Sequence, residues 1–379
     1  MDFELSQDHK VLQDSVRDFV VKEVKPLAMQ IDEQHAIPDE LVKKLAGMGL
    51  LGSYLPEAYG GAGLDILSYA IVVEEVSKAC ASTGILISAH TSLACDPILQ
   101  FGSEAQKQKY LPPLARGEKI GCILLTESDA GSDPAGLATV YHKDGDEFVI
   151  TGNKIFVTNG GFLGTGILLA SMDRELKHKG ISAFIVDLAS PGVELLRNES
   201  KLGIRGTYTS TFALNDLRLP AANLLGTEGQ GFKIAMETLN GGRIGVGAQA
   251  LGIAAGAYER ALAYARERKQ FGRAISEFQA IQFKLADMYM RIVSSRLLIY
   301  QSAWLKENKK PYATESAVCK LHASETATFV TKEALQIFGG YGYISEYEVE
   351  RMYRDAKITE IYEGTSEIQR LVISRALLS

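Results

Sequence analysis

The stretch FVITGNKIFVTNGG, residues 148–161, is rich in β-branched and aromatic residues and ends on two glycines. Such a composition, closed by turn residues, predicts a β-strand. Short segments of the same kind, bounded by Gly, Asn, Asp or Pro, follow as GILLASM (166–172), ISAFIVDL (181–188) and TSTFALNDLRLP (209–220). Together they predict an antiparallel sheet or barrel in the middle of the chain.

Helical patterns lie on both sides of these strands. Apolar residues recur at helical spacing between Val11 and Ile31, and Pro38-Asp39-Glu40 opens an amphipathic helix that ends near Gly47 and Gly49. Similar spacing predicts helices at 65–80, 104–115, 229–268, 276–306, 312–339 and 365–378. This order differs from the alternating pattern of a doubly wound fold and predicts an α+β protein. The expected parts are an N-terminal α-helical domain (1–118), a middle antiparallel β domain (119–226) and a C-terminal four-helix bundle (227–379).

Length and composition narrow the possible functions. The 379 residues exceed what one core usually organises, and the net charge of −6 argues against a nucleic-acid or anionic-membrane surface. The start Met1-Asp2-Phe3-Glu4 lacks the features of a signal peptide, and no apolar run reaches the length of a membrane span. We therefore expect a cytoplasmic protein. The four cysteines are scattered without CxxC spacing, so neither a metal site nor a disulfide framework is expected.

The predicted strand region carries candidate ligand contacts. A GxGxxG motif after a strand is missing, which argues against a Rossmann nicotinamide site, and GxxxxGK[ST] is also missing. LLTESDAGSDPAG (124–136) is a loop of hydroxyl, acid and small residues that either binds a ligand or forms a polar turn. KIFVTNGG (154–161) places Phe156 and Thr158 on the same side of a strand. An aromatic face beside a hydroxyl suits a flat heteroaromatic ring, but a cross-strand packing pair has the same pattern.

Two C-terminal segments contain glycines, one next to charged residues and the other directly after an apolar helix. RERKQFGRAISEFQAIQ (266–282) contains Arg268, whose guanidinium either holds a pyrophosphate or lies on a solvated basic helix end. ALQIFGGYGY (334–343) has two glycines directly after an apolar helix, as expected of a helix stop.

Two further C-terminal segments carry isolated charges. LNGGRIGVGAQALG (239–252) has small residues suited to close helix packing and one cation, Arg243, which is expected to be buried or to face a ligand. In IYEGTSEIQR (361–370), Glu363 stands between a tyrosine and Gly-Thr. By itself this carboxylate could be an ordinary surface charge.

Taken together, these segments resemble the acyl-CoA dehydrogenase family over almost the whole chain. LLTESDAGSD (124–133) resembles the family's first signature, and QIFGGYGY (336–343) with RDAKITEIYEGTSEIQ (354–369) resembles its second. The chain is most similar to the short-chain, butyryl-CoA-like branch. The resemblance implies the family's three-domain fold, non-covalent FAD, an acyl-CoA substrate, a homotetramer built as a dimer of dimers, and electron transfer to electron-transferring flavoprotein.

The resemblance also implies roles for individual residues. Phe156 would cover the flavin ring, where the family often has Trp, and Thr158 would hydrogen-bond near flavin N5. The other implied contacts are Thr126 and Ser132 with flavin and acyl-CoA; Arg268, Phe271 and Gln279 with FAD across the dimer; Gln336, Gly339 and Gly340 near the adenosine diphosphate part; Thr365 and Glu367 with FAD; and Arg243, Tyr362 and Gly364 with the substrate.

Glu363 matches the family's catalytic base in its commoner location. It would remove the α-proton of the thioester while the β-hydrogen leaves as hydride to flavin N5. The carboxylate must then reach the α-carbon from the face opposite the flavin, and burial should raise its pKa toward the working pH. The backbone N–H of Glu363 and a flavin ribityl hydroxyl would stabilise the thioester oxygen.

The chain departs from the family's pattern at three positions. Ser128 stands where the first signature usually has Pro, which only loosens the turn. Asn240 stands where close relatives often carry Asp, so a contact to the far end of the substrate would be neutral here. Asp96, in HTSLACDPILQFG (90–102), stands in the stretch that lines the family's acyl pocket, where a neutral residue is common.

Two interpretations of Asp96 are open. Asp before Pro97 is typical of a helix N-cap. In some relatives that act on alicyclic acyl-CoAs, an aspartate in this region is a base toward ring carbons and the usual glutamate is lost. Because Glu363 is retained, the main prediction is α,β-dehydrogenation of a short, branched or alicyclic acyl-CoA. The alternative is an alicyclic specialist, acting on cyclohexane-1-carbonyl-CoA or cyclohexene-carbonyl-CoA, with Asp96 as a second acid/base.

Two other classes fit the sequence less well. Typical acyl-CoA oxidases carry an additional C-terminal domain, and oxygen reactivity of the reduced flavin would distinguish them. A non-enzymatic helical scaffold would be colourless, and it does not explain why a candidate base and flavin motifs occur together.

Overall fold

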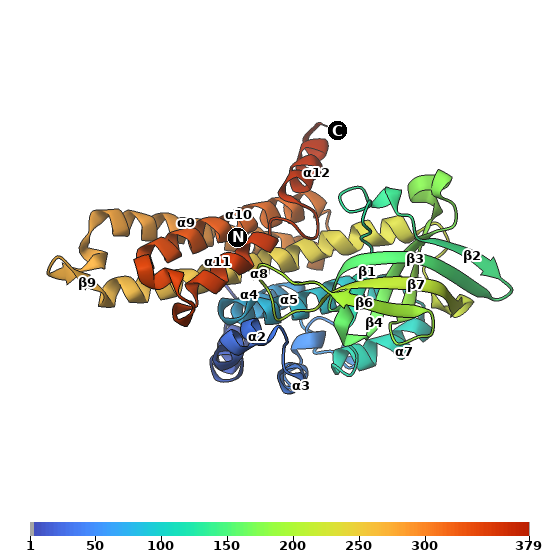
Figure 1. Ribbon diagram of the computed structural model, residues 1–379, viewed down its shortest axis with the longest axis horizontal. Coiled ribbons are helices and arrows are strands. Elements are labelled where there is room, and N and C mark those ends of the chain that lie inside the picture. Colours follow the sequence, from blue (N-terminus) through green and yellow to red (C-terminus); the bar gives the residue numbers. More distant parts are fainter. Residues whose placement is uncertain (1–3, 379) are drawn as a thin grey trace.

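The computed structural model describes residues 4–378 and follows the predicted order of helices, sheet and helices (Figure 1). Met1–Phe3, part of the N-terminus considered above, and Ser379 lie outside the described residues. The N-terminal helices are α1 (Gln7–Phe19), α2 (Ala28–Gln34), α3 (Asp39–Gly47), α4 (Ile66–Ala79), α5 (Ala81–His90), α6 (Asp96–Phe101) and α7 (Glu104–Ala115). The strands of the middle sheet are β1 (Gly121–Leu124), β2 (Val140–Asp144), β3 (Glu147–Thr158), β4 (Thr165–Ser171), β5 (Ile181–Asp187), β6 (Val193–Asn198), β7 (Thr209–Pro220) and β8 (Leu224–Leu225).

The C-terminal helices form a bundle, as predicted, but one of its helices, Val349–Ile358, lies outside the predicted helical segments. They are α8 (Gly231–Glu267), α9 (Gln279–Glu307), α10 (Ala313–Phe338), α11 (Val349–Ile358) and α12 (Ser366–Leu378), with the short hairpin β9 (Lys269–Gln270) and β10 (Arg273–Ala274) between α8 and α9. The helices α8, α9, α10 and α11 pack on one another, whereas α12 starts against α10 and then extends away from the body (Figure 1). Within residues 4–378, no helix combines the length and the apolarity needed to cross a membrane.

The middle sheet has the strand order β6-β7-β3-β2-β4-β5-β8, and β1 pairs with β4. Neighbouring strands run antiparallel, as predicted, except that β1 and one residue pair of β2 are parallel to β4. The register between β3 and β7 shifts twice, the second time between Lys154 and Val157. This second bulge contains Phe156, whose φ is +56°. Because a bulge bends its strand and redirects a side chain, it decides where this aromatic ring points.

Helix α8 joins the three regions of the chain. It packs against α4 and α5, against β5 of the sheet, and against α9 and α10. Its glycines permit close approach: a Cβ at Gly245 would overlap the hydroxyl groups of Tyr69 and Ser88, and one at Gly252 would overlap the backbone of Glu74. The prediction of close helix packing along 239–252 is therefore confirmed.

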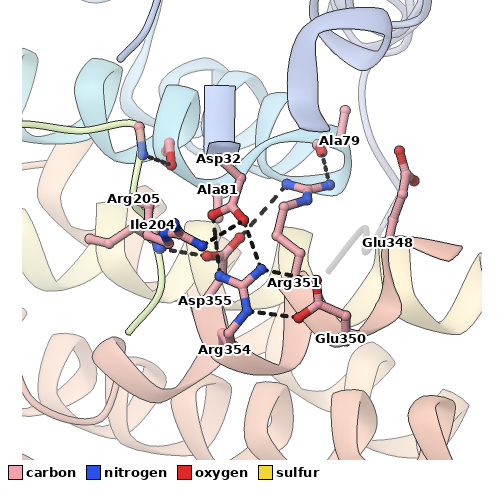
Figure 2. A network of polar contacts seen from close by, with 12 residues as sticks. Asp32, Ala79, Ala81, Ile204, Arg205, Glu348, Glu350, Arg351, Arg354 and Asp355 are labelled. Carbon is pink, nitrogen blue, oxygen red and sulfur yellow. Dashed lines mark hydrogen bonds and ion pairs between the residues drawn. The ribbon is translucent and has the colours of Figure 1, made fainter. Parts of the chain in front are cut away.

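A polar network ties α11 to the other two regions (Figure 2). Arg354 donates to both carboxylate oxygens of Asp32, at 3.2 and 2.7 Å, and to the carbonyl oxygen of Leu202 at 3.2 Å. The next residue, Asp355, accepts a hydrogen bond from the backbone N–H of Ile204. Because Asp32 belongs to α2 and residues 202–204 belong to the sheet region, the turn that follows α11 starts from a firmly anchored helix.

Candidate active site

Glu363 lies in the turn between α11 and α12, where two successive residues are left-handed. Its φ is +51° and that of Gly364 is +95°. The carbonyl oxygens of these two residues accept hydrogen bonds from Gln369 Nε2, at 3.3 and 2.8 Å. The Gly364 carbonyl also accepts from Lys320 Nζ at 2.8 Å. These bonds hold a conformation that glutamate rarely adopts, and thereby fix the direction of its side chain.

The Glu363 carboxyl group approaches α8 closely. A Cβ at Gly242 would overlap its Oε2 atom, so a larger residue at that position would displace the carboxyl group. The residue as a whole is partly exposed, but Oε2 is buried and has no hydrogen-bond partner among residues 4–378. Burial raises the pKa of Glu363 to about 7, although the charges of Lys320 and Arg243 oppose the rise. A buried, unpartnered carboxyl group that ionises near neutral pH is suited to accept a proton.

Arg243 follows Gly242 on α8 and is also buried. Its Nη1 donates to Asn240 Oδ1 at 2.8 Å, while its Nε has no partner among the described residues. Burial lowers the pKa of Arg243, and the charge of Glu363 opposes this change most. Asn240, the neutral residue noted in the sequence, therefore orients Arg243, and the free Nε is available to a ligand.

A buried ion pair fixes the loop that starts at Thr126. The carboxylate of Glu127 accepts from Lys154 Nζ at 2.6 Å and from the N–H of Thr139 at 3.1 Å. Burial opposes ionisation of this acid, but Lys154 and the backbone amides keep the pKa of Glu127 below its usual range. The carbonyl oxygen of Thr126 accepts from the N–H of Ile155 at 2.9 Å, so the loop lies against β3.

Phe156 and Thr158 flank the buried Val157 and are both more exposed than it. The Phe156 side chain is 60% exposed, and Thr158 is half-buried. Both side chains therefore reach the surface near the end of β3, next to the Thr126 loop. Ser132, farther along the same loop, is exposed.

A second group of candidate residues lies at the C-terminal end of α10, away from Glu363. It consists of Arg268, Gly339 and Gly340. They belong to a hollow of about 450 Å³ between the start of the β9–β10 hairpin and the end of α10. The Arg268 guanidinium lies 5.5 Å from the centre of the Tyr341 ring. No atom of the described residues lies within 4 Å of where a Cβ would stand on either glycine, so their backbone is open to a ligand. Gln336 is exposed on the last turn of α10, next to this hollow.

The remaining candidate residues lie either near the β9–β10 hairpin or near the Glu363 turn. Phe271, at the tip of the β9–β10 hairpin, is 93% exposed, and Gln279 is exposed where α9 begins. Thr365 caps α12, because its Oγ1 accepts from the N–H of Ile368 at 3.4 Å. Glu367 is exposed in the first turn of α12. Tyr362 uses its hydroxyl to bond the side chain of Gln249 on α8.

Asp96 does not cap a helix, which corrects one interpretation of the sequence. The π-helical turn Thr91–Cys95 runs directly into α6, and Asp96 has helical angles, with φ −60° and ψ −50°. An N-cap residue must leave helical conformation, so this one cannot act as a cap. Its Oδ2 instead accepts from Lys306 Nζ at 2.8 Å and from Gln100 Nε2 at 2.7 Å. The ion pair lies beside Gly241, one residue from the glycine that contacts Glu363.

Sequence reasoning missed the lysines of this site. Lys320, Lys306 and Lys154 all make buried contacts, and none was predicted to be functional. A signal for Lys320 was present, because it lies at helical spacing from small residues such as Ser316 and Ala323, which are buried on one face of α10.

Comparisons with known proteins agree with this architecture. Models of the N-terminal, middle and C-terminal domains of acyl-CoA dehydrogenases match residues 6–118, 122–217 and 229–378. The chain is 52% identical to "Acyl-CoA dehydrogenase, short-chain specific" from Clostridium acetobutylicum, over 99% of each chain. It superposes with a TM-score of 0.98 on butyryl-CoA dehydrogenase from Megasphaera elsdenii, at 46% identity over 100% of both chains. It superposes equally well, with 48% identity over 100% of both chains, on a chain in a structure titled for the electron transferring flavoprotein of Acidaminococcus fermentans.

A helical–sheet–helical fold with a buried carboxyl group between α8 and α12, together with these matches, shows that the chain belongs to the acyl-CoA dehydrogenase family. Within that family it is similar to short-chain-specific enzymes. The predictions of the family, of its fold, of an oxidoreductase that dehydrogenates acyl-CoA and of FAD as the cofactor are confirmed.

Proposed function

We propose that the protein converts a short-chain acyl-CoA thioester to the 2-enoyl-CoA and that Glu363 is the base that removes the α-proton. The observation that carries this proposal is the state of the Glu363 carboxyl group. It is buried at Oε2, has no partner there among the described residues, and is held by a left-handed turn. Its pKa of about 7 makes an ionised form available at neutral pH.

The chain offers two groups of residues that suit FAD. Phe156 and Thr158 present an aromatic face and a hydroxyl, which fit a flat heteroaromatic ring. Arg268 and the open backbone at Gly339 and Gly340 fit a diphosphate. The further proposed contacts are Thr126, Ser132, Phe271, Gln279, Gln336, Thr365 and Glu367. FAD, when bound, supplies the acceptor for the hydride that leaves the β-carbon.

Arg243, Tyr362 and Gly364 are the proposed substrate contacts. The free Nε of Arg243 supports this role, because a buried donor without a partner is costly unless a ligand satisfies it. Tyr362 would offer its ring, since its hydroxyl already bonds Gln249. The backbone N–H of Glu363 is proposed to stabilise the thioester oxygen as enolate character develops.

Asp96 receives less support as a second acid/base for an alicyclic acyl group. Its Oδ2 already accepts from Lys306 and Gln100, and the ion pair is largely shielded from solvent, with the Asp96 side chain 4% exposed and the Lys306 side chain 11% exposed. Using this oxygen for proton transfer would break a buried ion pair, which is strongly destabilising. The alicyclic alternative is therefore kept only as an outcome of the test below.

We further propose an assembly and an acceptor. Electron-transferring flavoprotein is the proposed acceptor, because a highly similar chain occurs in the structure titled for that protein. The large separation of the two groups of proposed FAD residues on one chain supports a site shared by two copies, and the pairing of two such dimers is proposed from the family resemblance alone. Domain boundaries after residues 118 and 226 are supported by their positions between α7 and β1 and between β8 and α8. A cytoplasmic location remains a prediction.

The test is anaerobic bleaching of the enzyme's flavin by butyryl-, isobutyryl-, isovaleryl-, octanoyl-, glutaryl- and cyclohexane-1-carbonyl-CoA, with the product mass measured for each. The proposal predicts fast bleaching by butyryl-CoA and a product lighter by two hydrogens. Fast bleaching by the cyclic thioester, with little from butyryl-CoA, would contradict it and favour the alicyclic alternative. Rapid re-oxidation of the reduced flavin by oxygen would instead favour an oxidase.

A further inference from the structure

Lys320 is a buried ammonium that forms no ion pair within residues 4–378. Its side chain on α10 is fully buried, and its one hydrogen bond goes to the carbonyl oxygen of Gly364, at 2.8 Å. Burying an ammonium without a close counter-ion costs folding free energy, and an apolar residue of the same length would avoid this cost. The position of Lys320 therefore calls for a reason other than stability.

We propose that Lys320 is a positioning residue for Glu363: its ammonium group holds the turn that carries the base and favours the ionised form of the base. This inference rests on the proposed function, in which Glu363 takes up the α-proton. Lys320 itself touches neither the reacting atoms nor, by this proposal, the cofactor.

The positioning part follows from the backbone. Glu363 and Gly364 are both left-handed, and a glutamate leaves that conformation readily unless neighbouring groups hold it. Only two side chains bond the carbonyl groups of these residues within the described chain, Gln369 from α12 and Lys320 from α10. Since α10 packs against α8, α9, α11 and α12, Lys320 connects the turn to the core of the bundle.

The electrostatic part follows from the groups around the ammonium. Those that face Lys320 are Glu363 and Glu360 on the turn, Arg243 on α8 and Glu367 on α12. Burial lowers the pKa of Lys320 to about 8, and Glu363 is the charge that most opposes this change.

The same coupling acts on the base. Burial raises the pKa of Glu363, and Lys320 opposes the rise more than Arg243 does. Tyr69 on α4 and the adjacent Tyr362 are the other titratable groups that sense the Glu363 charge. Both are phenols whose pKa lies above its ordinary value, so they are neutral while Glu363 titrates. Removing the charge at position 320 should therefore raise the pKa of the base further.

The test compares Lys320→Met, which removes the charge and the donor, with Lys320→Gln, which keeps a donor without the charge. Lys332→Met is the matched control, because Lys332 lies on the same helix with its side chain 69% exposed. Each holoenzyme is assayed for kcat/KM against pH, for FAD content and for Tm. Protonation of Glu363 is read without turnover from the infrared carboxyl band that Glu363→Gln removes.

For Lys320→Met we expect an unchanged FAD content and an unchanged or higher Tm. The pH midpoints of the infrared carboxyl band and of kcat/KM should both be about one pH unit higher, so that kcat/KM at pH 6 falls about tenfold. Lys320→Gln should show the same alkaline shift with a smaller loss of kcat, and Lys332→Met should match the wild type. If Lys320→Met leaves both midpoints in place, the inference is wrong. If it fails to fold, Lys320→Gln decides by the same criterion. Turnover retained in Glu363→Gln would overturn the proposed function itself, which is a separate result.

Discussion

At the scale of single residues, the candidate site is marked by backbone conformations that side-chain propensities do not predict. Glu363, Phe156 and Phe271 have φ values of +51°, +56° and +51°. Left-handed conformations of bulky residues cost on the order of 1–3 kcal/mol each and persist only where their surroundings hold them. A sequence can nominate these residues through motifs, but it gives no sign that they are left-handed.

The pKa of Glu363 gives a residue-scale prediction. Because the ionised form is the base, kcat/KM for butyryl-CoA should fall as pH is lowered through about 7. The folded pKa of Glu363 lies above the ordinary value of 4.5, so the contribution of this group to the free energy of unfolding falls as the pH rises between these two values. The stabilising contribution is fully present below the ordinary pKa. Loss of activity at pH 6 should therefore occur without loss of Tm. An acid limb near pH 4.5 in the kcat/KM profile would contradict this assignment.

At the scale of elements, periodic segments were predicted well. The helix expected from Pro38-Asp39-Glu40 to Gly47 is α3 (Asp39–Gly47), and the strand quoted first is β3 (Glu147–Thr158). The helix α5 was missed, because every residue from Ala81 to His90 is buried and no polar face marks its period.

Asp96 shows how tertiary contacts override a local signal. Asp-Pro commonly begins a helix, but here the preceding π-helical turn continues into α6. The partner that decides the role of Asp96 is Lys306, which lies 210 residues farther along the chain on α9. No local pattern could have identified this pair, whereas Glu363, the proposed base, could be nominated from a motif because the residues of that motif are contiguous.

Gly242 supports a prediction about helix α8. A Cβ there would overlap Glu363 Oε2 and lie 3.0 Å from the Leu93 side chain, so Gly242→Ala should displace the carboxyl group. A displacement of about 1 Å is expected to lower kcat about 100-fold. Gly247→Ala on the same helix is the control, because its Cβ would lie 3.3 Å from the nearest atom, Cγ1 of Ile299, and would not meet Glu363. Equal kcat values for the two folded variants would show that the Glu363–α8 contact does not matter for the reaction.

At the scale of the whole molecule, the two groups of residues proposed to bind FAD lie far apart. Phe156 and Thr158 belong to β3 of the sheet, whereas Arg268 lies at the end of the bundle that carries the β9–β10 hairpin (Figure 1). Lys320, beside Glu363, and Phe338, beside the Arg268 hollow, are about 27 Å apart along α10 at 1.5 Å per residue. The hairpin that carries Phe271 forms the end of the molecule farthest from the sheet (Figure 1). This separation supports the proposal that a complete site takes Glu363 from one copy and Arg268 from another.

Mixed dimers test this arrangement. Arg268→Leu should weaken FAD binding and Glu363→Gln should remove the base, so each variant alone should be nearly inactive. If each site combines residues of two copies, a dimer with one subunit of each kind has one intact site, and its activity should be about half that of the wild type. Co-expression with two affinity tags isolates such dimers. Activity no higher than that of the parent variants would place each site within a single chain.

The central claim is that Glu363 is the base for short-chain acyl-CoA dehydrogenation, and one measurement tests it most directly. The flavin of purified Glu363→Gln is mixed anaerobically with butyryl-CoA, beside wild type and Glu325→Gln, which alters an exposed acid paired with Arg370. The account predicts full FAD content in all three proteins, fast bleaching in wild type and Glu325→Gln, and bleaching at least about 1,000-fold slower in Glu363→Gln, at the level of removing a general base. Bleaching of Glu363→Gln at a rate near that of wild type would contradict the account.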